Sequence, residues 1–166
     1  MKLQIGGFLE NSLVNGDGIR SVIFVSGCNH NCVSCQNEFM QDFNYGEDVS
    51  IDDIVKRIKK NMPIIKGVTF SGGEPFESAQ ALSKLSETFK SLGLNIWCYS
   101  GYTYNEIINS GDIDKLTFLN FIDVLIDGKF DEALVESASK YTGSSNQRII
   151  DVEKSVLENQ IVLWYK

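Results

Sequence analysis

The chain has 166 residues and a formal charge of −7, from 22 acidic and 15 basic side chains. This length fits about one domain, and a hydrophobic fraction of 43% excludes disorder, collagen and coiled coil. The acidic balance, without a basic stripe, argues against a nucleic-acid-binding protein. No apolar run reaches the ~18 residues of a membrane-spanning helix, and the N-terminus is too broken for a signal peptide. We therefore expect a single cytoplasmic domain over residues 1–166, with no membrane or nucleic-acid partner.

Short apolar runs alternate with amphipathic stretches along the chain. Strands are predicted at 22–25, 68–70, 95–99, 124–126, 148–150 and 161–164. Helices are predicted at 50–58, 78–92, 104–109, 112–120, 131–137 and 152–158. This alternation is typical of a parallel sheet with helices outside it. A full barrel of this kind needs about 250 residues, so we expect an α/β fold that is either an incomplete parallel barrel or an open doubly wound sheet.

Two of the predicted helices carry terminal signals. Ser50 and Asp53 stand where a capping box at a helix N-terminus would place its two side chains. Gly93 follows the helix at 78–92 and suits the left-handed conformation that ends many helices.

Three of the four cysteines lie together in the segment GCNHNCVSC at residues 27–35, directly after the first predicted strand. Cys28, Cys32 and Cys35 have the spacing C-x3-C-x2-C. The asparagines and the glycine favour a loop, which can fold three thiolates around one metal centre. Four cysteines close a [4Fe–4S] cluster, so three would leave one iron open for substrate chemistry, as in catalytic zinc sites.

Other interpretations of the cysteines stay open. His30 is the only histidine in the chain and lies inside the motif, so a Cys3His zinc site is possible, although the gap from Cys28 is tight for a fourth ligand. Accidental clustering is the weakest interpretation, and a reducing cytoplasm disfavours disulfides. Cys98 lies in an apolar strand and is expected to be a small buried core residue, with a fourth-ligand role as the alternative.

A second motif, SGGEP at residues 71–75, follows the strand at 68–70. Its two glycines let the backbone approach a ligand closely, and Glu74 supplies a carboxylate. A tight turn without a ligand is the alternative. Both motifs stand at the carboxyl ends of successive predicted strands, and that edge of a parallel α/β sheet holds the active site.

The order of the two motifs resembles the radical S-adenosylmethionine (SAM) superfamily. Four further segments narrow this resemblance: NGDGIR at 15–20, WCYSGY at 97–102, DVLIDGKF at 123–130 and GSSNQR at 143–148. Over residues 5 to 151, roughly, the chain is similar to the proteins that activate anaerobic ribonucleoside-triphosphate reductases. The resemblance implies a partial barrel of radical SAM type.

The resemblance also implies a mechanism. Cys28, Cys32 and Cys35 would hold a [4Fe–4S] cluster whose fourth iron is chelated by the amino and carboxylate groups of SAM. Reductive cleavage would release methionine and a 5′-deoxyadenosyl radical, which would take a hydrogen atom from a glycine of the large reductase subunit. Reduced flavodoxin or ferredoxin would supply the electron. Hydrogen-atom transfer moves no free proton, so no catalytic side chain is expected beyond the cluster and SAM.

Seven further residues are implied to bind SAM. They are Ser34, Gln36, Gly72, Gly73, Glu74, Asp127 and Lys129. The two that flank Cys35 stand where the family contacts the adenosine. The glycine turn can present backbone groups to the methionine amino group, and the carboxylate after it can attract the positive charge. The last two end a strand where similar enzymes use charged residues near SAM, with a solvated turn as the alternative.

The segment that follows, Asn146-Gln147-Arg148, is left open between contact with SAM, contact with the partner and a turn before a strand.

Competing functions stay open as well. The chain could activate another glycyl-radical enzyme, such as pyruvate formate-lyase, or act on a small molecule, such as a deazaguanine synthase does. From a different class, it could be a non-catalytic zinc or electron-transfer iron–sulfur protein. The short length favours a protein substrate, because an incomplete barrel is open at its side and suits a polypeptide loop.

Overall fold

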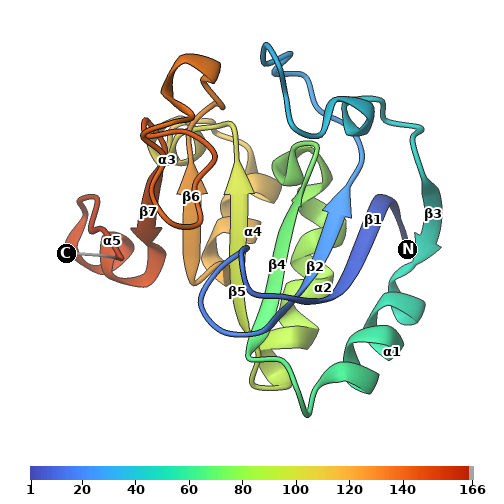
Figure 1. Cartoon of the computed structure of the whole chain (residues 1–166). Helices are drawn as coiled ribbons and strands as arrows, with labels where there is room; N and C mark the ends of the chain where they lie inside the picture. Colours follow the sequence, from blue (N-terminus) through green and yellow to red (C-terminus); the bar gives the residue numbers. More distant parts are fainter. Residues whose placement is uncertain (165–166) are drawn as a thin grey trace.

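One mixed β-sheet runs through residues 1–164, the part of the chain that the computed structural model describes (Figure 1). Its strands are β1 (Lys2–Ser12), β2 (Arg20–Val25), β3 (Glu47–Ser50), β4 (Gly67–Gly72), β5 (Asn95–Ser100), β6 (Val124–Asp127) and β7 (Arg148–Asp151). They lie in the order β3-β1-β2-β4-β5-β6-β7. The neighbours β2, β4, β5 and β6 pair in parallel, whereas β1, β3 and β7 pair antiparallel. The α/β class is confirmed, but the prediction of a wholly parallel sheet is wrong at both margins.

Local sequence explains these differences at the margins. Residues 13–19 join β1 to β2, and a parallel crossover needs about a dozen residues or more. The sequence did not predict β1, because Gly6 and Gly7 interrupt its apolar pattern, nor β3, which is short and acidic. The strand predicted at 161–164 is reduced to one bridge, between Leu163 and Ile150 beside β7.

The helices cover one face of the sheet, with α2 and α4 behind the strands in Figure 1. The α-helices of the described chain are α1 (Ile51–Asn61), α2 (Ala79–Ser91), α3 (Tyr104–Ile108), α4 (Ile113–Phe121) and α5 (Val152–Glu158), and the 3-10 helices are η1 (Glu38–Gln41), η2 (Pro75–Ser78) and η3 (Glu132–Leu134). Every one of these α-helices contributes to a single hydrophobic core. The alternative of a doubly wound sheet, with helices on both faces, is therefore wrong, and the helix predicted at 131–137 is only the short η3. Within residues 1–164, no helix is long and apolar enough to cross a membrane.

Both predicted terminal signals are confirmed. The Ser50 hydroxyl accepts a hydrogen bond from the backbone N–H of Asp53 at 3.1 Å, at the start of α1. Gly93 follows α2 with φ of +82°, a backbone conformation that residues other than glycine rarely adopt.

Alternate side chains of the central strands form two apolar layers. On the helix side, the Phe70 ring packs against Phe89 and Phe118, with ring centroids 6.4 and 5.8 Å away. Cys98 is fully buried in this layer, which confirms the prediction of a core cysteine. Trp97, its neighbour in β5, points to the other face and belongs to a second, smaller layer.

Arg20 at the start of β2 joins the connection at residues 13–19 to the sheet. Its side chain is fully buried, and burial lowers the pKa of its guanidinium to about 10. The guanidinium donates to the Thr69 hydroxyl at 2.8 Å, and to the backbone oxygens of Asp17 and Val68, both at 3.0 Å. Its central carbon lies 5.5 Å from the centre of the Trp97 ring. The connection is thus held against the face of the sheet opposite the helices, in front of β4 and β5 in Figure 1.

Replacement of Cys98 by alanine tests the assignment of this cysteine to the core. We expect Cys98→Ala to lower the free energy of unfolding by about 1 kcal/mol, because one buried sulfur is removed from a packed layer. Urea unfolding measures this loss. The variant should bind as much iron as the parent protein after anaerobic reconstitution, and a folded variant that binds no iron would contradict the core assignment.

Candidate metal and cofactor site

A cavity of about 580 Å³ opens at the carboxyl edge of the parallel strands, where four segments of the chain meet Val14 and Asn15 of the connection before β2. These segments are the loop at residues 26–37 after β2, which we call the cysteine loop, the ends of β4 and β5, and the connection at 128–147 after β6. The register brings these ends level, since Val25 pairs with Gly72, and Ser100 pairs with Asp127. The predicted motifs at residues 27–35 and 71–75 therefore meet at one cavity.

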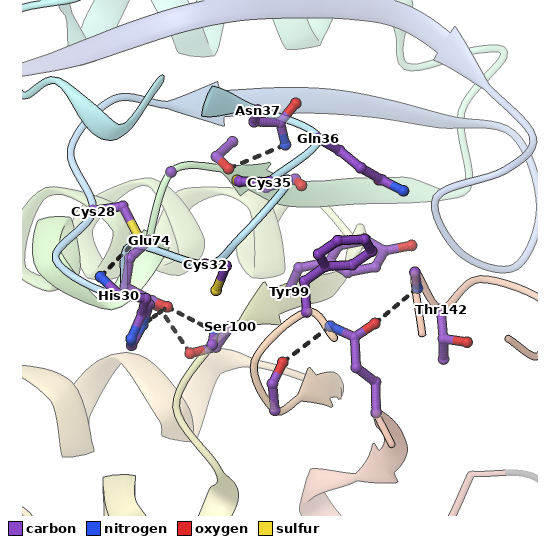
Figure 2. Close-up of a pocket in the computed structure, with 18 of the residues that line it drawn as sticks. Cys28, His30, Cys32, Cys35, Gln36, Asn37, Glu74, Tyr99, Ser100 and Thr142 are labelled. Atoms are coloured by element: carbon purple, nitrogen blue, oxygen red, sulfur yellow. Dashed lines mark hydrogen bonds and ion pairs between the residues drawn. The ribbon is translucent and has the colours of Figure 1, made fainter. Parts of the chain in front are cut away.

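The three clustered cysteines line this cavity along the cysteine loop, opposite Tyr99 and Thr142 (Figure 2). All three thiols are free and partly exposed. The loop has no regular structure between Cys28 and Cys35. It reverses direction through left-handed residues, with φ of +53° at Asn31 and +57° at Ser34. The structure thus brings the three thiols to one cavity.

The thiols fit an iron–sulfur cluster better than a single ion. Among residues 1–164, no group of three or more His, Cys, Asp and Glu side chains is arranged to hold a metal ion. The cysteines of a [4Fe–4S] cluster bind different irons, so a shared cavity suits them without convergence on one point. Burial raises the pKa of the Cys28 thiol to about 11, while the backbone N–H of His30, 3.5 Å from its sulfur, acts in the opposite direction. A cluster bound there would replace the proton of this thiol.

His30 points away from the thiols, toward the end of β4. Its Nε2 lies 2.7 Å from Glu74 Oε2, and its side chain is 8% exposed. The carboxylate can only accept, so Nε2–H donates this bond. The Nε2 of His30 is therefore engaged by a carboxylate and is not available as a zinc ligand.

Glu74 is fully buried, and its carboxylate is surrounded by donors. Oε1 accepts from the backbone N–H of Phe76 at 3.0 Å and from the Ser100 hydroxyl at 2.9 Å. Oε2 accepts from the Gly101 N–H and from His30, both at 2.7 Å. A carboxylate has about four acceptor sites, so a direct bond from the amino group of SAM would displace one of these donors. Contact between Glu74 and SAM stays a prediction.

The glycine turn lies against the end of β2 and the start of the cysteine loop, too closely for any other residue. A Cβ at Gly72, where φ is +100°, would lie 2.4 Å from the Val25 oxygen, and one at Gly73 would lie 2.6 Å from the Gly27 oxygen. The Gly73 N–H donates to the Val25 oxygen at 2.7 Å. The Asn37 amide donates to the Gly72 oxygen at 3.2 Å. The turn therefore fixes both ends of the cysteine loop.

The structure brings most of the sequence-predicted site residues to the cavity. Those that line it are Cys28, Cys32, Cys35, Gln36, Gly72, Gly73 and Glu74. Ser34, Asp127 and Lys129 do not line it. Ser34 is exposed on the cysteine loop, and Lys129 is exposed in a neighbouring groove with Val33. Asp127 is buried below the cavity edge.

Comparison with known proteins decides the family. Residues 14–150 match the family described as "4Fe-4S single cluster domain". The chain is 32% identical over 149 residues to the anaerobic ribonucleoside-triphosphate reductase-activating protein of Haemophilus influenzae, across 86% of this chain and 94% of that protein. The chain belongs to this family of activating proteins. The proteins of the same name from Escherichia coli K12 and enterobacteria phage T4 are 33% and 32% identical, across 81% and 82% of this chain and 90% and 86% of theirs.

Family membership confirms the resemblance to the activating proteins that was seen in the sequence and gives the protein a cofactor class. A match to a single-cluster 4Fe-4S domain that spans the cysteine loop supports an iron–sulfur cluster in this protein.

The segment at 146–148, whose role the sequence left open, holds the turn after β6. Arg148 donates to both oxygens of Asp127, at 3.0 and 2.6 Å, and the Tyr104 N–H adds a third bond at 2.8 Å. Gln147 donates to the Gly128 oxygen at 2.9 Å, and Asn146 donates to the Lys129 oxygen at 2.7 Å. The DGK and NQR segments of the two motifs therefore form one hydrogen-bonded unit.

Sequence reasoning missed Tyr99 as a cavity residue. Its hydroxyl donates to the Tyr141 backbone oxygen at 2.6 Å, and burial raises its pKa to about 12. The signal was present, because residues alternate across a strand: if Cys98 faces the core, Tyr99 must face the opposite side.

Loss of Arg148 tests how strongly the bonded unit depends on the ion pair. Asp127 is 1% exposed, and Arg148→Ala would leave it with the Tyr104 N–H as donor. We expect the free energy of unfolding to fall by about 2 kcal/mol, because a buried charged acceptor loses its partner. Arg148→Lys should recover only part of this loss, since lysine lacks the bidentate fork.

Lys2→Ala is the matched control for this experiment. Lys2 and Asp48 form an exposed pair at 4.0 Å, and such pairs contribute about 0–1 kcal/mol. Denaturant unfolding of the three variants measures the free energy of unfolding that each one loses. Equal losses for Arg148→Ala and Lys2→Ala would show that the buried pair stabilises the fold no more than the exposed pair.

Proposed function

We propose that this chain is a radical SAM enzyme that generates a glycyl radical on the large subunit of an anaerobic ribonucleoside-triphosphate reductase. The observation that carries the proposal is the meeting of three free thiols, spaced C-x3-C-x2-C, with a glycine turn in one cavity. The relatives named as activating proteins support the partner. The open, parallel-centred sheet supports a partial barrel of radical SAM type.

Cys28, Cys32 and Cys35 would hold the [4Fe–4S] cluster, with reduced flavodoxin or ferredoxin as the electron donor. When bound, the cluster supplies the electron that splits SAM into methionine and the 5′-deoxyadenosyl radical, which then takes a hydrogen atom from the target glycine. The chain itself binds and orients. The short gap between Cys32 and Cys35 requires a tight turn, which the left-handed conformation of Ser34 makes.

The residues proposed for SAM binding differ in how directly they reach the cavity. Gln36 and the backbone of Gly72 and Gly73 line it and are suited to direct contact. The buried charge of Glu74 attracts an ammonium group across the cavity wall. Asp127 and Lys129 would act from the turn after β6, the first by fixing that turn and the second as a charge beside the cavity.

The cavity suits hydrogen-atom transfer rather than acid–base chemistry. The Nε2 of His30 is bonded to Glu74, and the Tyr99 hydroxyl, whose pKa burial raises to about 12, donates to the Tyr141 backbone oxygen. Both groups are engaged by other protein groups, so we assign neither of them the role of a general base. A reaction that moves a neutral hydrogen atom needs no such base.

Anaerobic reconstitution tests the proposal in three steps. The protein should become brown and hold about four iron and four sulfide per chain. After reduction in the presence of SAM it should release 5′-deoxyadenosine. Addition of the reductase should then give a glycyl-radical signal by electron paramagnetic resonance. A colourless zinc protein would exclude the proposed chemistry, and an iron–sulfur protein that leaves SAM intact would point to electron transfer.

Two cysteine variants sharpen this test. Cys32→Ala should lose the cluster and all SAM cleavage, because one of three ligands is removed. Cys98→Ala is the matched control and should keep both, since that thiol lies in the core. If SAM is cleaved but the radical forms on pyruvate formate-lyase instead of the reductase, the enzyme class stands and the partner is wrong.

A further inference from the structure

His30 ties the middle of the cysteine loop to the ends of two neighbouring strands. We propose that His30 is a positioning residue, which holds the loop in the shape that binds the cluster through its bond to Glu74. The inference rests on the proposed function only in taking Cys28 and Cys32 as cluster ligands. His30 stands between them in the sequence, two residues from each.

Glu74 is a junction for the carboxyl ends of three parallel strands. Its donors come from the loop after β2, from the turn after β4 and from the end of β5. An unpaired buried carboxylate is strongly disfavoured, so the fold gains from keeping every donor in place. His30 is the donor that belongs to the cysteine loop, and its bond draws the loop toward the sheet edge (Figure 2).

The rest of the loop centre lacks such a tie. In segment 29–36, which the structure describes throughout, His30 alone donates a side-chain hydrogen bond to another element. The loop is otherwise fixed near its ends, where the Gly27 N–H donates to the Met40 oxygen at 2.7 Å and Asn37 donates to Gly72 at 3.2 Å. Without the His30 ring, the segment that carries Cys32 would be fixed only by the hydrogen bonds near the two ends of the loop.

The His30 ring is also packed closely between neighbouring residues. Its centroid lies 4.6 Å from that of Tyr102, in an edge-to-face contact at 73°. On another side it touches Gly101, where a Cβ would lie 2.5 Å from the ring. The Tyr102 hydroxyl donates to Glu77, and the Lys115 ammonium lies 4.4 Å from the centre of the Tyr102 ring. Both the space and the bond therefore select one ring position.

Support of this kind is worth a measurable amount at metal sites. Groups that orient ligands without touching the metal change metal affinity by about 10–100-fold when removed. The backbone N–H of His30 also lies 3.5 Å from the Cys28 sulfur. A displaced ring would therefore disturb that contact as well as the position of Cys32.

Three variants test the inference on the reconstituted full chain. We expect His30→Ala to release iron to a chelator about 10-fold faster than the parent protein, and to broaden the paramagnetic resonance spectrum of the reduced cluster. His30→Gln keeps an N–H donor at a similar reach and should recover most of the difference. Gly101→Ala keeps every polar group but pushes the ring from its seat, so it should behave like His30→Ala.

Asn29→Ala is the matched control, because Asn29 is an exposed neighbour in the same loop. It should release iron at the parental rate. Parental iron release and spectrum in both His30→Ala and Gly101→Ala would overturn the inference, as would equal losses in His30→Ala and His30→Gln. These readouts need neither SAM nor a reductase. A parent protein that binds no cluster would instead refute the proposed function.

Discussion

The buried carboxylate of Glu74 is the interaction on which the site depends. Four donors from three strand ends converge on it, and a carboxylate so far from water requires all of them. The requirement reaches back to the sequence. Gly72 and Gly73 must be glycines so that the turn can pass against the end of β2 and the cysteine loop, and the residue after them, Glu74, then bonds to His30.

A second buried charge has the corresponding role at the opposite end of the sheet. Arg20 has no bonded carboxylate, and its guanidinium donates instead to a hydroxyl and to backbone oxygens of the connection and strands around it. Arg20 therefore donates several hydrogen bonds to the groups around it, whereas Glu74 accepts several from the groups around it. One holds the connection at 13–19, which brings Asn15 to the cavity wall, and the other holds the cysteine loop. The cavity lies between two loops that each depend on one buried charge.

The sequence predicted the centre of the fold better than its margins, for a physical reason. β2, β4, β5 and β6 are buried on both faces, so their apolar runs are continuous. Edge strands lack that constraint: β3 reads EDVS, and only tertiary pairing makes it a strand. Local signals such as the Ser50 cap were equally readable, because they depend on neighbours three residues away.

The candidate site divides in the same way. The cysteine spacing and the glycine turn are local patterns, and they met at one cavity as strand order required. The partners of Asp127 and Glu74 could not be predicted, because all of them except the Phe76 N–H lie between 21 and 44 positions away in the sequence. The sequence alone shows a carboxylate after a strand. It cannot show whether that carboxylate binds a ligand or accepts hydrogen bonds from the protein itself. In this structure the carboxylates of Asp127 and Glu74 are both bonded to protein donors.

This distribution of bonds bears on what the cavity can do. His30, Glu74 and Tyr99 line it, and each is engaged by another protein group. Within residues 1–164, the thiols of Cys32 and Cys35 face the cavity as free cysteines outside those bonds. A site whose polar groups are bonded among themselves, while soft thiol ligands face the space, is suited to a bound metal centre that carries the chemistry while the protein holds it still.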